Sequence, residues 1–174
     1  MRGAPAVAVV SAWLGASALF AAVVAPAAFE VLPSRALAGA VVGRVLPVIF
    51  VAGIVAALLG IWLDRAAVGR VYRVRRAAFA VMALACAAAQ FGVAPRIERV
   101  RAEIGGALDA LPPGDARRIV FGRLHAISVG WLGLAMVAAG ATIVLALLPA
   151  ATGRAGDHAV APTARPMEAG RTSR

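Results

Sequence analysis

The chain contains no lysine, and all 18 of its basic residues are arginine. Charged residues of both signs make up only 15% of its 174 residues, against about 25% in ordinary soluble domains. A single cysteine, Cys86, excludes an internal disulfide, and no Cys/His spacing resembles a zinc site. These shortages exclude both an ordinary soluble domain and a small domain held together by disulfides or zinc.

Long apolar stretches dominate the sequence instead. The chain is 62% hydrophobic, its mean hydropathy is +0.87, and four stretches reach the roughly 17–25 residues of a membrane-spanning helix. They cover residues 4–32, 36–63, 77–95 and 119–149. Polar residues do not alternate with apolar ones, as they would in an outer-membrane barrel. The sequence predicts an all-α, polytopic four-helix membrane bundle built from two helical hairpins.

The organisation follows from these spans. Residues 1–150 form the predicted transmembrane domain, residues 96–115 an amphipathic connector within it, and residues 151–174 a disordered tail. Gly105-Gly106 is a candidate break in the connector, and Asp115 is placed to cap the fourth helix. The connector is predicted either to extend the third helix beyond the membrane or to restart along the membrane surface, because its apolar residues are spaced by 3, 4, 4 and 3: Ile97, Val100, Ile104, Leu108 and Leu111.

Two short motifs recur in the same order in both hairpins. Ala25-Pro26 in the first span is matched by Ala94-Pro95 in the third, and Gly43-Arg44 in the second by Gly122-Arg123 in the fourth. Two hairpins with one orientation would form a parallel repeat. Chance is the alternative, because the composition is strongly biased to Ala, Val and Gly.

The positions of the arginines indicate what the chain binds and how it is oriented in the membrane. The net charge of +10 could indicate nucleic-acid binding in a soluble protein, but these arginines lie at helix ends and in loops, where lipid headgroups are the expected partner. No nucleic-acid partner is therefore expected. The strongest local signal is a cluster beside two spans, which predicts an inner-membrane protein with both termini in the cytoplasm: Arg65, Arg70, Arg73, Arg75 and Arg76.

Arg44 and Arg123 stand out because each lies about two turns inside an apolar stretch. An arginine in hydrocarbon costs several kcal/mol unless it is paired or reaches the interface. One hypothesis pairs Arg44 with Glu30 and Arg123 with Glu98, each within one hairpin. The alternative is that both guanidinium groups extend outward to the level of the lipid phosphates.

His125 and Ser128 lie three residues apart in the fourth span and complete the candidate polar layer. The histidine could handle protons or bind a metal, or it could make a hydrogen bond between helices.

Two further patterns have a packing alternative. Met82, Cys86 and Met136 offer sulfur ligands for a soft metal, but core packing is the favoured role. Small-residue patterns at 39–43, 53–57 and 126–130 predict close helix approach.

Several of these motifs resemble the transmembrane-protein-205-like family. The resemblance covers about residues 10–148, and its most specific part is Phe121-x-x-Leu124-His125-x-x-Ser128. It is carried also by Ala25-Pro26-x-x-Phe29-x-x-Leu32, Ala38-Gly39, Leu46-Pro47, Phe50 and Pro95. An Asn that often follows the serine in that family is missing from residues 129–132. The resemblance implies a four-helix membrane domain without an agreed activity, although a eukaryotic relative is linked with resistance to platinum drugs.

The function expected from these observations is a structural or interaction module in the membrane. The alternative is a small transporter, or a soft-metal or drug efflux component, with a polar layer around His125, Arg44 and Arg123. No catalytic motif or cofactor site is visible in the sequence, so an enzyme is not expected. The lipid bilayer is the expected partner, while a homo-oligomer and a metal ion stay open.

Overall fold

The computed structural model describes residues 4–105, 110–112 and 114–147, and every regular element in these ranges is helical. The first helical stretch consists of α1 (Ala4–Leu19), η1 (Phe20–Val24) and α2 (Ala25–Val31). After a short turn comes α3 (Arg35–Leu63). The third stretch consists of α4 (Arg70–Ala87), η2 (Ala88–Val93) and α5 (Ala94–Ile104), and the fourth is α6 (Ala116–Leu147). The predicted all-α four-helix fold is confirmed.

All four stretches are long and apolar enough to cross a membrane, with 28, 29, 35 and 32 residues. At 1.5 Å per residue, about 20 residues cross a hydrocarbon layer of roughly 30 Å. Each stretch therefore extends past that layer. Large apolar side chains cover the outer faces, among them Val23, Val48, Val55, Leu84, Phe91 and Val137. The chain is a multi-pass integral membrane protein.

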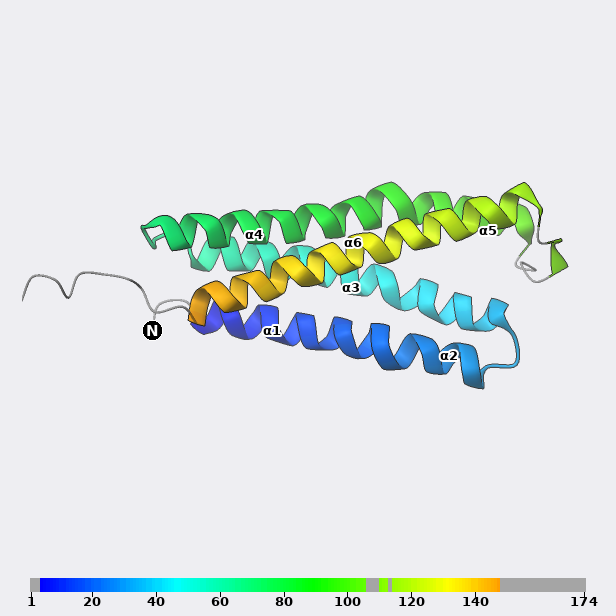
Figure 1. Ribbon diagram of the computed structural model, residues 1–174, viewed down its shortest axis with the longest axis horizontal. Coiled ribbons are helices and arrows are strands. Elements are labelled where there is room, and N and C mark those ends of the chain that lie inside the picture. Colours follow the sequence, from blue (N-terminus) through cyan, green and yellow to red (C-terminus); the bar gives the residue numbers. More distant parts are fainter. Residues whose placement is uncertain (1–3, 106–109, 113, 148–174) are drawn as a thin grey trace, which may run out of the picture.

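The helices form a ring in which α1 contacts α3 and α6, and α4 contacts the same two helices. Figure 1 shows the start of α1, the end of α6 and the turn between α3 and α4 at one end of the bundle. The turns that follow α2 and α5 lie at the opposite end. The two hairpins therefore run in the same direction across the bundle.

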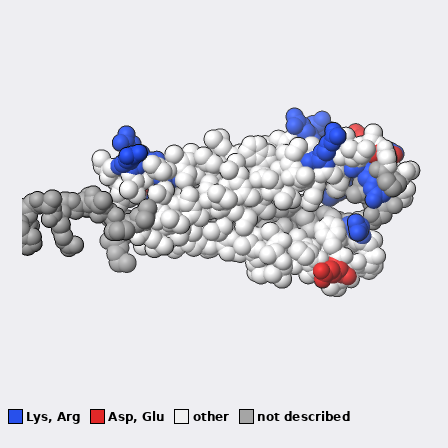
Figure 2. Space-filling model, viewed as in Figure 1, with Lys and Arg blue, Asp and Glu red and all other residues white. Residues whose placement is uncertain are grey.

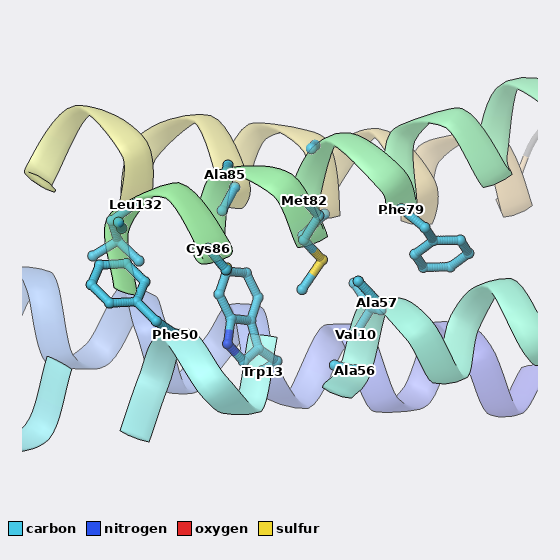
Figure 3. Close-up of a cluster of buried hydrophobic side chains, with 14 of the residues drawn as sticks. Val10, Trp13, Phe50, Ala56, Ala57, Phe79, Met82, Ala85, Cys86 and Leu132 are labelled. Atoms are coloured by element: carbon cyan, nitrogen blue, oxygen red, sulfur yellow. The ribbon is translucent and has the colours of Figure 1, made fainter. Parts of the chain in front are cut away.

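A compact core fills the half of the bundle nearest the chain ends (Figure 3). The Trp13 indole nitrogen donates to the carbonyl oxygen of Ile49 at 2.9 Å, which joins α1 to α3. Gly53 permits a close approach, because a Cβ there would lie 2.7 Å from Cys86 Sγ and 2.9 Å from the Trp13 ring. Met82 and Cys86 are fully buried, and Met136 packs against the core. The packing role of these sulfur residues is confirmed.

The other two small-residue patterns, at 39–43 and 126–130, have different surroundings. Around Gly43 the neighbour is an arginine side chain, described below, and not a helix backbone. Gly130 is exposed, and a Cβ there would meet nothing within 4 Å. The prediction of close helix approach at 126–130 is therefore wrong for Gly130, which lies on an outward face of α6.

Each hairpin begins with a helix that contains a π turn directly before an Ala-Pro pair. η1 precedes Ala25-Pro26, and η2 precedes Ala94-Pro95. Proline cannot donate to the helix, and its ring clashes with the carbonyl four residues earlier. A wide turn at that point relieves the clash without ending the helix. The two hairpins thus share a backbone irregularity as well as a sequence motif.

The third stretch continues without interruption into α5, which is the first of the two alternatives that the amphipathic spacing predicts. It ends at Gly105, whose φ of +67° is a left-handed conformation that favours glycine. The predicted break is confirmed at this residue. Leu108 and the predicted disordered tail at 151–174 lie outside the described residues.

A buried ion pair closes the turn between α3 and α4. Asp64 and Arg75 are 1% and 3% exposed, and Arg75 Nη2 lies 2.7 Å from both Asp64 oxygens. Arg65, the neighbour of Asp64 in sequence, instead lies over the Trp62 ring at 4.3 Å. Among the clustered arginines, Arg75 therefore fixes the connection between the two hairpins from inside.

Candidate functional site

The bundle opens at the end opposite the chain ends. There α2 contacts α3, and α5 contacts α6, while few contacts join the two pairs. A cavity of about 770 Å³ lies between them, with walls from α2, the first half of α3, η2, α5 and the first half of α6. Figure 2 shows basic side chains around a hollow at this end and no charged side chain along the middle of this face.

The cavity combines an apolar wall with a polar group of side chains. Its apolar residues include Phe29, Leu46, Phe50, Ile97, Ile104 and Phe121. Its polar residues, which we call the cavity polar group, are Arg35, Gln90, Glu98, Arg101, Arg118, His125 and Ser128. The volume and the mixed lining are typical of small-molecule sites.

Arg101 links the two hairpins across this cavity. Its Nη2 donates to the carbonyl oxygen of Gly39 on α3 at 3.1 Å, and its Nη1 lies 2.7 Å from Glu98 Oε1 on its own helix. The guanidinium carbon lies 6.0 Å from the centre of the Phe121 ring on α6. Gly43 leaves space for it, because a Cβ there would lie 2.7 Å from Nη1. One side chain thus contacts three helices.

Gln90 and Ser128 lie toward the inner end of the cavity. Gln90 belongs to the π turn η2, and its Oε1 is buried without a hydrogen-bond partner among the described residues. Ser128 is only 4% exposed. A buried polar atom without a partner typically costs about 1–3 kcal/mol, and π turns are frequent at functional sites. These features favour a site that a ligand or water completes.

Asp115 begins the helix that carries Arg118, His125 and Ser128. Its Oδ1 accepts from the main-chain nitrogen of Arg117 at 2.8 Å, so the predicted cap is confirmed. The Arg117 side chain donates to both carboxylate oxygens. These hydrogen bonds, together with the nearby positive charge, lower the pKa of Asp115 to about 2. Arg118 donates instead to the carbonyl oxygen of Leu111 at 2.9 Å.

The structure brings half of the predicted polar layer together. Glu98, His125 and Ser128 line the cavity, whereas Glu30, Arg44 and Arg123 do not. Both predicted ion pairs are wrong, since no bridge joins Arg44 to Glu30 or Arg123 to Glu98 in the part of the chain that is described. Glu98 pairs with Arg101 instead.

Helix geometry explains why Arg44 and Arg123 face outward. Consecutive residues are about 100° apart around a helix, so Arg44 points away from the face on which Gly43 lines the cavity. Both arginines are exposed. Counting about 20 residues back from Leu63 reaches the level of Arg44, at the edge of the hydrocarbon. The Arg44 side chain can therefore extend to the lipid headgroups, which explains how an arginine is tolerated in this span.

His125 lies beside an aromatic ring and makes no hydrogen bond to another described residue. Its ring is parallel to that of Phe121, with 6.5 Å between the ring centres. The described part of the structure therefore does not contain the hydrogen bond between helices that was considered for His125. The described residues contain no group of three or more His, Cys, Asp or Glu side chains that could hold a metal.

Sequence reasoning missed Arg35, Arg101, Arg118 and Gln90 as cavity residues. A signal for Arg101 was present, because Glu98 lies three residues before it and Gly39 and Gly43 offer a bare helix face. Gln90 carried another signal, as a lone amide in an apolar span five residues before Pro95.

Fold and site together define a four-helix integral membrane protein with an amphipathic cavity at one end. Residues 8–105 match the model of a family described as a domain of unknown function, DUF4149. This match covers more than half of the chain, which therefore belongs to that family. It spans the first three helical stretches and stops before α6. No curated protein and no solved structure matches the chain.

Proposed function

We propose that this protein is a membrane-embedded binding or transport component whose ligand occupies the cavity between the two hairpins. Sequence alone favours a structural or interaction module, and the cavity is the observation that favours the alternative. A module that served only as a scaffold would need no opening between its hairpins. The polar layer of this proposal is the cavity polar group, with His125 in it and Arg44 and Arg123 outside it.

Contrast between the two ends of the bundle supports this proposal. Near the chain ends, Trp13, Gly53 and Cys86 are in close contact, and Phe79 and Met82 are fully buried. The same chain therefore packs its helices tightly where small and large residues interlock. At the cavity end, the walls instead enclose a volume of about 770 Å³ lined by both apolar and polar side chains. An opening of this size in a bundle that is otherwise closely packed is what a role in binding explains.

Several further properties belong to the proposal. No nucleophile hydrogen-bonded to a base supports catalysis among the described residues, so we do not propose an enzyme. The arginine cluster at 65–76 supports an inner-membrane location with both chain ends in the cytoplasm. The cavity would then open on the opposite side. Kinship with the transmembrane-protein-205-like family rests on the sequence motifs alone.

Filling the cavity tests the proposed function. Gly122 lines the cavity, and a Cβ there meets nothing within 4 Å, so the side chain of Gly122→Trp begins in open space beside the cavity. Gly130→Trp is the matched control, because Gly130 has equal room on the same helix and does not line the cavity. The protein is placed in phosphatidylcholine nanodiscs with hexadecyl phosphate, hexadecanol or hexadecylamine.

We expect at least one probe to raise the unfolding temperature of the wild type and of Gly130→Trp, and to have no effect on Gly122→Trp. Failure of all three probes, or equal responses of the two variants, would contradict a ligand site in this cavity.

A further inference from the structure

We infer that the cavity binds an anionic amphiphile from the membrane, meaning an acidic phosphate or carboxylate group attached to an apolar chain. This inference rests on the proposed function and adds the chemical class of the ligand.

Charge in the cavity favours an anion. Three arginines line it, Arg35, Arg101 and Arg118, against a single carboxylate, that of Glu98. Glu98 is already paired with Arg101. Arg35 has no ion pair within residues 4–105, 110–112 and 114–147. Excess positive charge in a partly enclosed site attracts anions, and guanidinium groups match phosphate and carboxylate geometry. A metal cation, which the sequence left open, is disfavoured here by the same charge.

The distribution of polarity along the helices favours an amphiphile over a small anion. Arg35, Arg101 and Arg118 lie near the outer ends of α3, α5 and α6, at or beyond the edge of the hydrocarbon as counted from the other ends of these helices. Leu46, Pro47 and Phe50 on α3 lie within about 20 residues of Leu63, at the level of the hydrocarbon. An anionic amphiphile has the same arrangement, because its charged headgroup lies at the membrane interface and its apolar chain lies in the hydrocarbon. A free inorganic anion would leave the apolar wall unused.

The route of entry also favours the membrane as the source. The walls belong to two hairpins that make few contacts with each other at this end, and exposed apolar residues such as Val48 and Ile127 lie on them outside the cavity lining. A lipid can therefore move from the bilayer into the space between the hairpins with its chain in apolar surroundings throughout.

The experiment separates headgroup from chain. Full-length protein in phosphatidylcholine nanodiscs is titrated with hexadecyl phosphate, with hexadecanol (chain without acid) and with inorganic phosphate (acid without chain). Native mass spectrometry gives the stoichiometry, and the unfolding temperature gives the affinity. We expect saturable one-to-one binding of hexadecyl phosphate and no binding of the other two.

Variants on α6 then locate the headgroup. Arg118→Gln should weaken hexadecyl phosphate binding about tenfold, the loss expected for one charged hydrogen bond. Arg123→Gln, five residues later and outside the cavity, should leave binding unchanged. Should Arg118→Gln not fold, Arg35→Gln replaces it, because Arg35 is exposed at the first position of α3.

Each outcome bears on a different statement. Equal binding of hexadecanol, or binding of inorganic phosphate alone, would overturn the anionic amphiphile while leaving a cavity ligand intact, provided that Gly122→Trp still blocks it. Equal weakening by Arg118→Gln and Arg123→Gln would show a general headgroup attraction, and would also overturn the inference. Binding that Gly122→Trp does not affect would overturn the proposed function itself.

Discussion

Arg101 Nη2 donates to the carbonyl oxygen of Gly39, 62 residues earlier in the chain, at 3.1 Å. This hydrogen bond joins α5 of the second hairpin to α3 of the first, across a region where the hairpins otherwise make few contacts. It depends on Gly43, because a side chain there would compete with the guanidinium for the same space. We therefore expect Arg101 to set the separation of the cavity walls.

The first prediction concerns this link. Gly43→Ala places a methyl group 2.7 Å from the Arg101 Nη1 position, whereas Gly39→Ala finds its nearest atom at 3.8 Å. Since a flexible side chain can move aside, we expect Gly43→Ala to fold but to lose the hydrogen bond to Gly39. Nitroxide labels at Val41 and Glu103, in a Cys86→Ala background, should show a broader distance distribution in Gly43→Ala. An unchanged distribution, or an equal change in Gly39→Ala, would count against control by Arg101.

The buried pair of Asp64 and Arg75 gives a second prediction. Asp64→Leu leaves a guanidinium that is 3% exposed without its partner, and removing one member of a buried pair costs about 3–5 kcal/mol. The double variant Asp64→Leu/Arg75→Leu should recover most of this loss, because no unpaired charge stays buried. Reversible unfolding in mixed micelles measures both free energies. Equal destabilisation of the single and double variants would show that the pair does not act as a unit.

Close packing at Gly53 gives a third prediction. A methyl group there meets Cys86 Sγ at 2.7 Å and the Trp13 ring at 2.9 Å, so Gly53→Ala should lower the free energy of unfolding by about 1–3 kcal/mol. Gly133→Ala on α6 is the control, since its Cβ meets nothing within 4 Å, and alanine favours a helix by up to about 1 kcal/mol. The same unfolding assay should therefore give changes of opposite sign. A stabilising Gly53→Ala would show that α1, α3 and α4 can move apart at this position without any loss in the free energy of unfolding.

A fourth prediction concerns pH at the start of α6. Because the pKa of Asp115 is lowered from 3.8 to about 2, its contribution to stability is fully present above pH 3.8. It is lost as the pH falls from 3.8 through about 2. The amide signals of Arg117 and Ile119 should then broaden or shift in this interval, as measured by NMR. Asp115→Asn retains a cap acceptor but cannot titrate, so the same signals should not respond. A transition near pH 5 or above in the wild type would contradict this assignment.

The sequence was sufficient to predict the number and type of the helices, because the length of an apolar stretch sets a span regardless of its surroundings. It also located the end of α5 at Gly105 and the cap at Asp115, since both depend on local backbone chemistry. His125, Ser128 and Glu98, which the sequence groups in one polar layer, line one cavity.

Which face of each helix points inward could not be predicted. In a soluble protein, polar residues mark the outer face of a helix, but here Ala, Val, Leu and Gly cover every face, because lipid and core are both apolar. Arg44 lies three residues before Pro47, and Arg101 lies six residues after Pro95 in a segment with two other arginines, and neither context shows which way the side chain points. Only the rotation of their helices decides that Arg44 meets lipid and Arg101 meets Gly39. In the same way, the sequence does not show that Arg75 pairs with Asp64, because the turn between α3 and α4 brings the two side chains together.

The helical stretches have unequal lengths, with 35 residues from Arg70 to Ile104 against 28 from Ala4 to Val31. At 1.5 Å per residue, the difference is about 10 Å. The tip of the second hairpin, at the end of α5, carries charged residues such as Arg99 and Glu103, which lie about 30 residues from Arg70 and thus beyond the hydrocarbon. A macromolecule too large to enter the bilayer, such as an antibody raised against this tip, could reach it from one compartment only. Its binding to intact cells or to inverted vesicles would establish the sidedness of the protein in a single measurement.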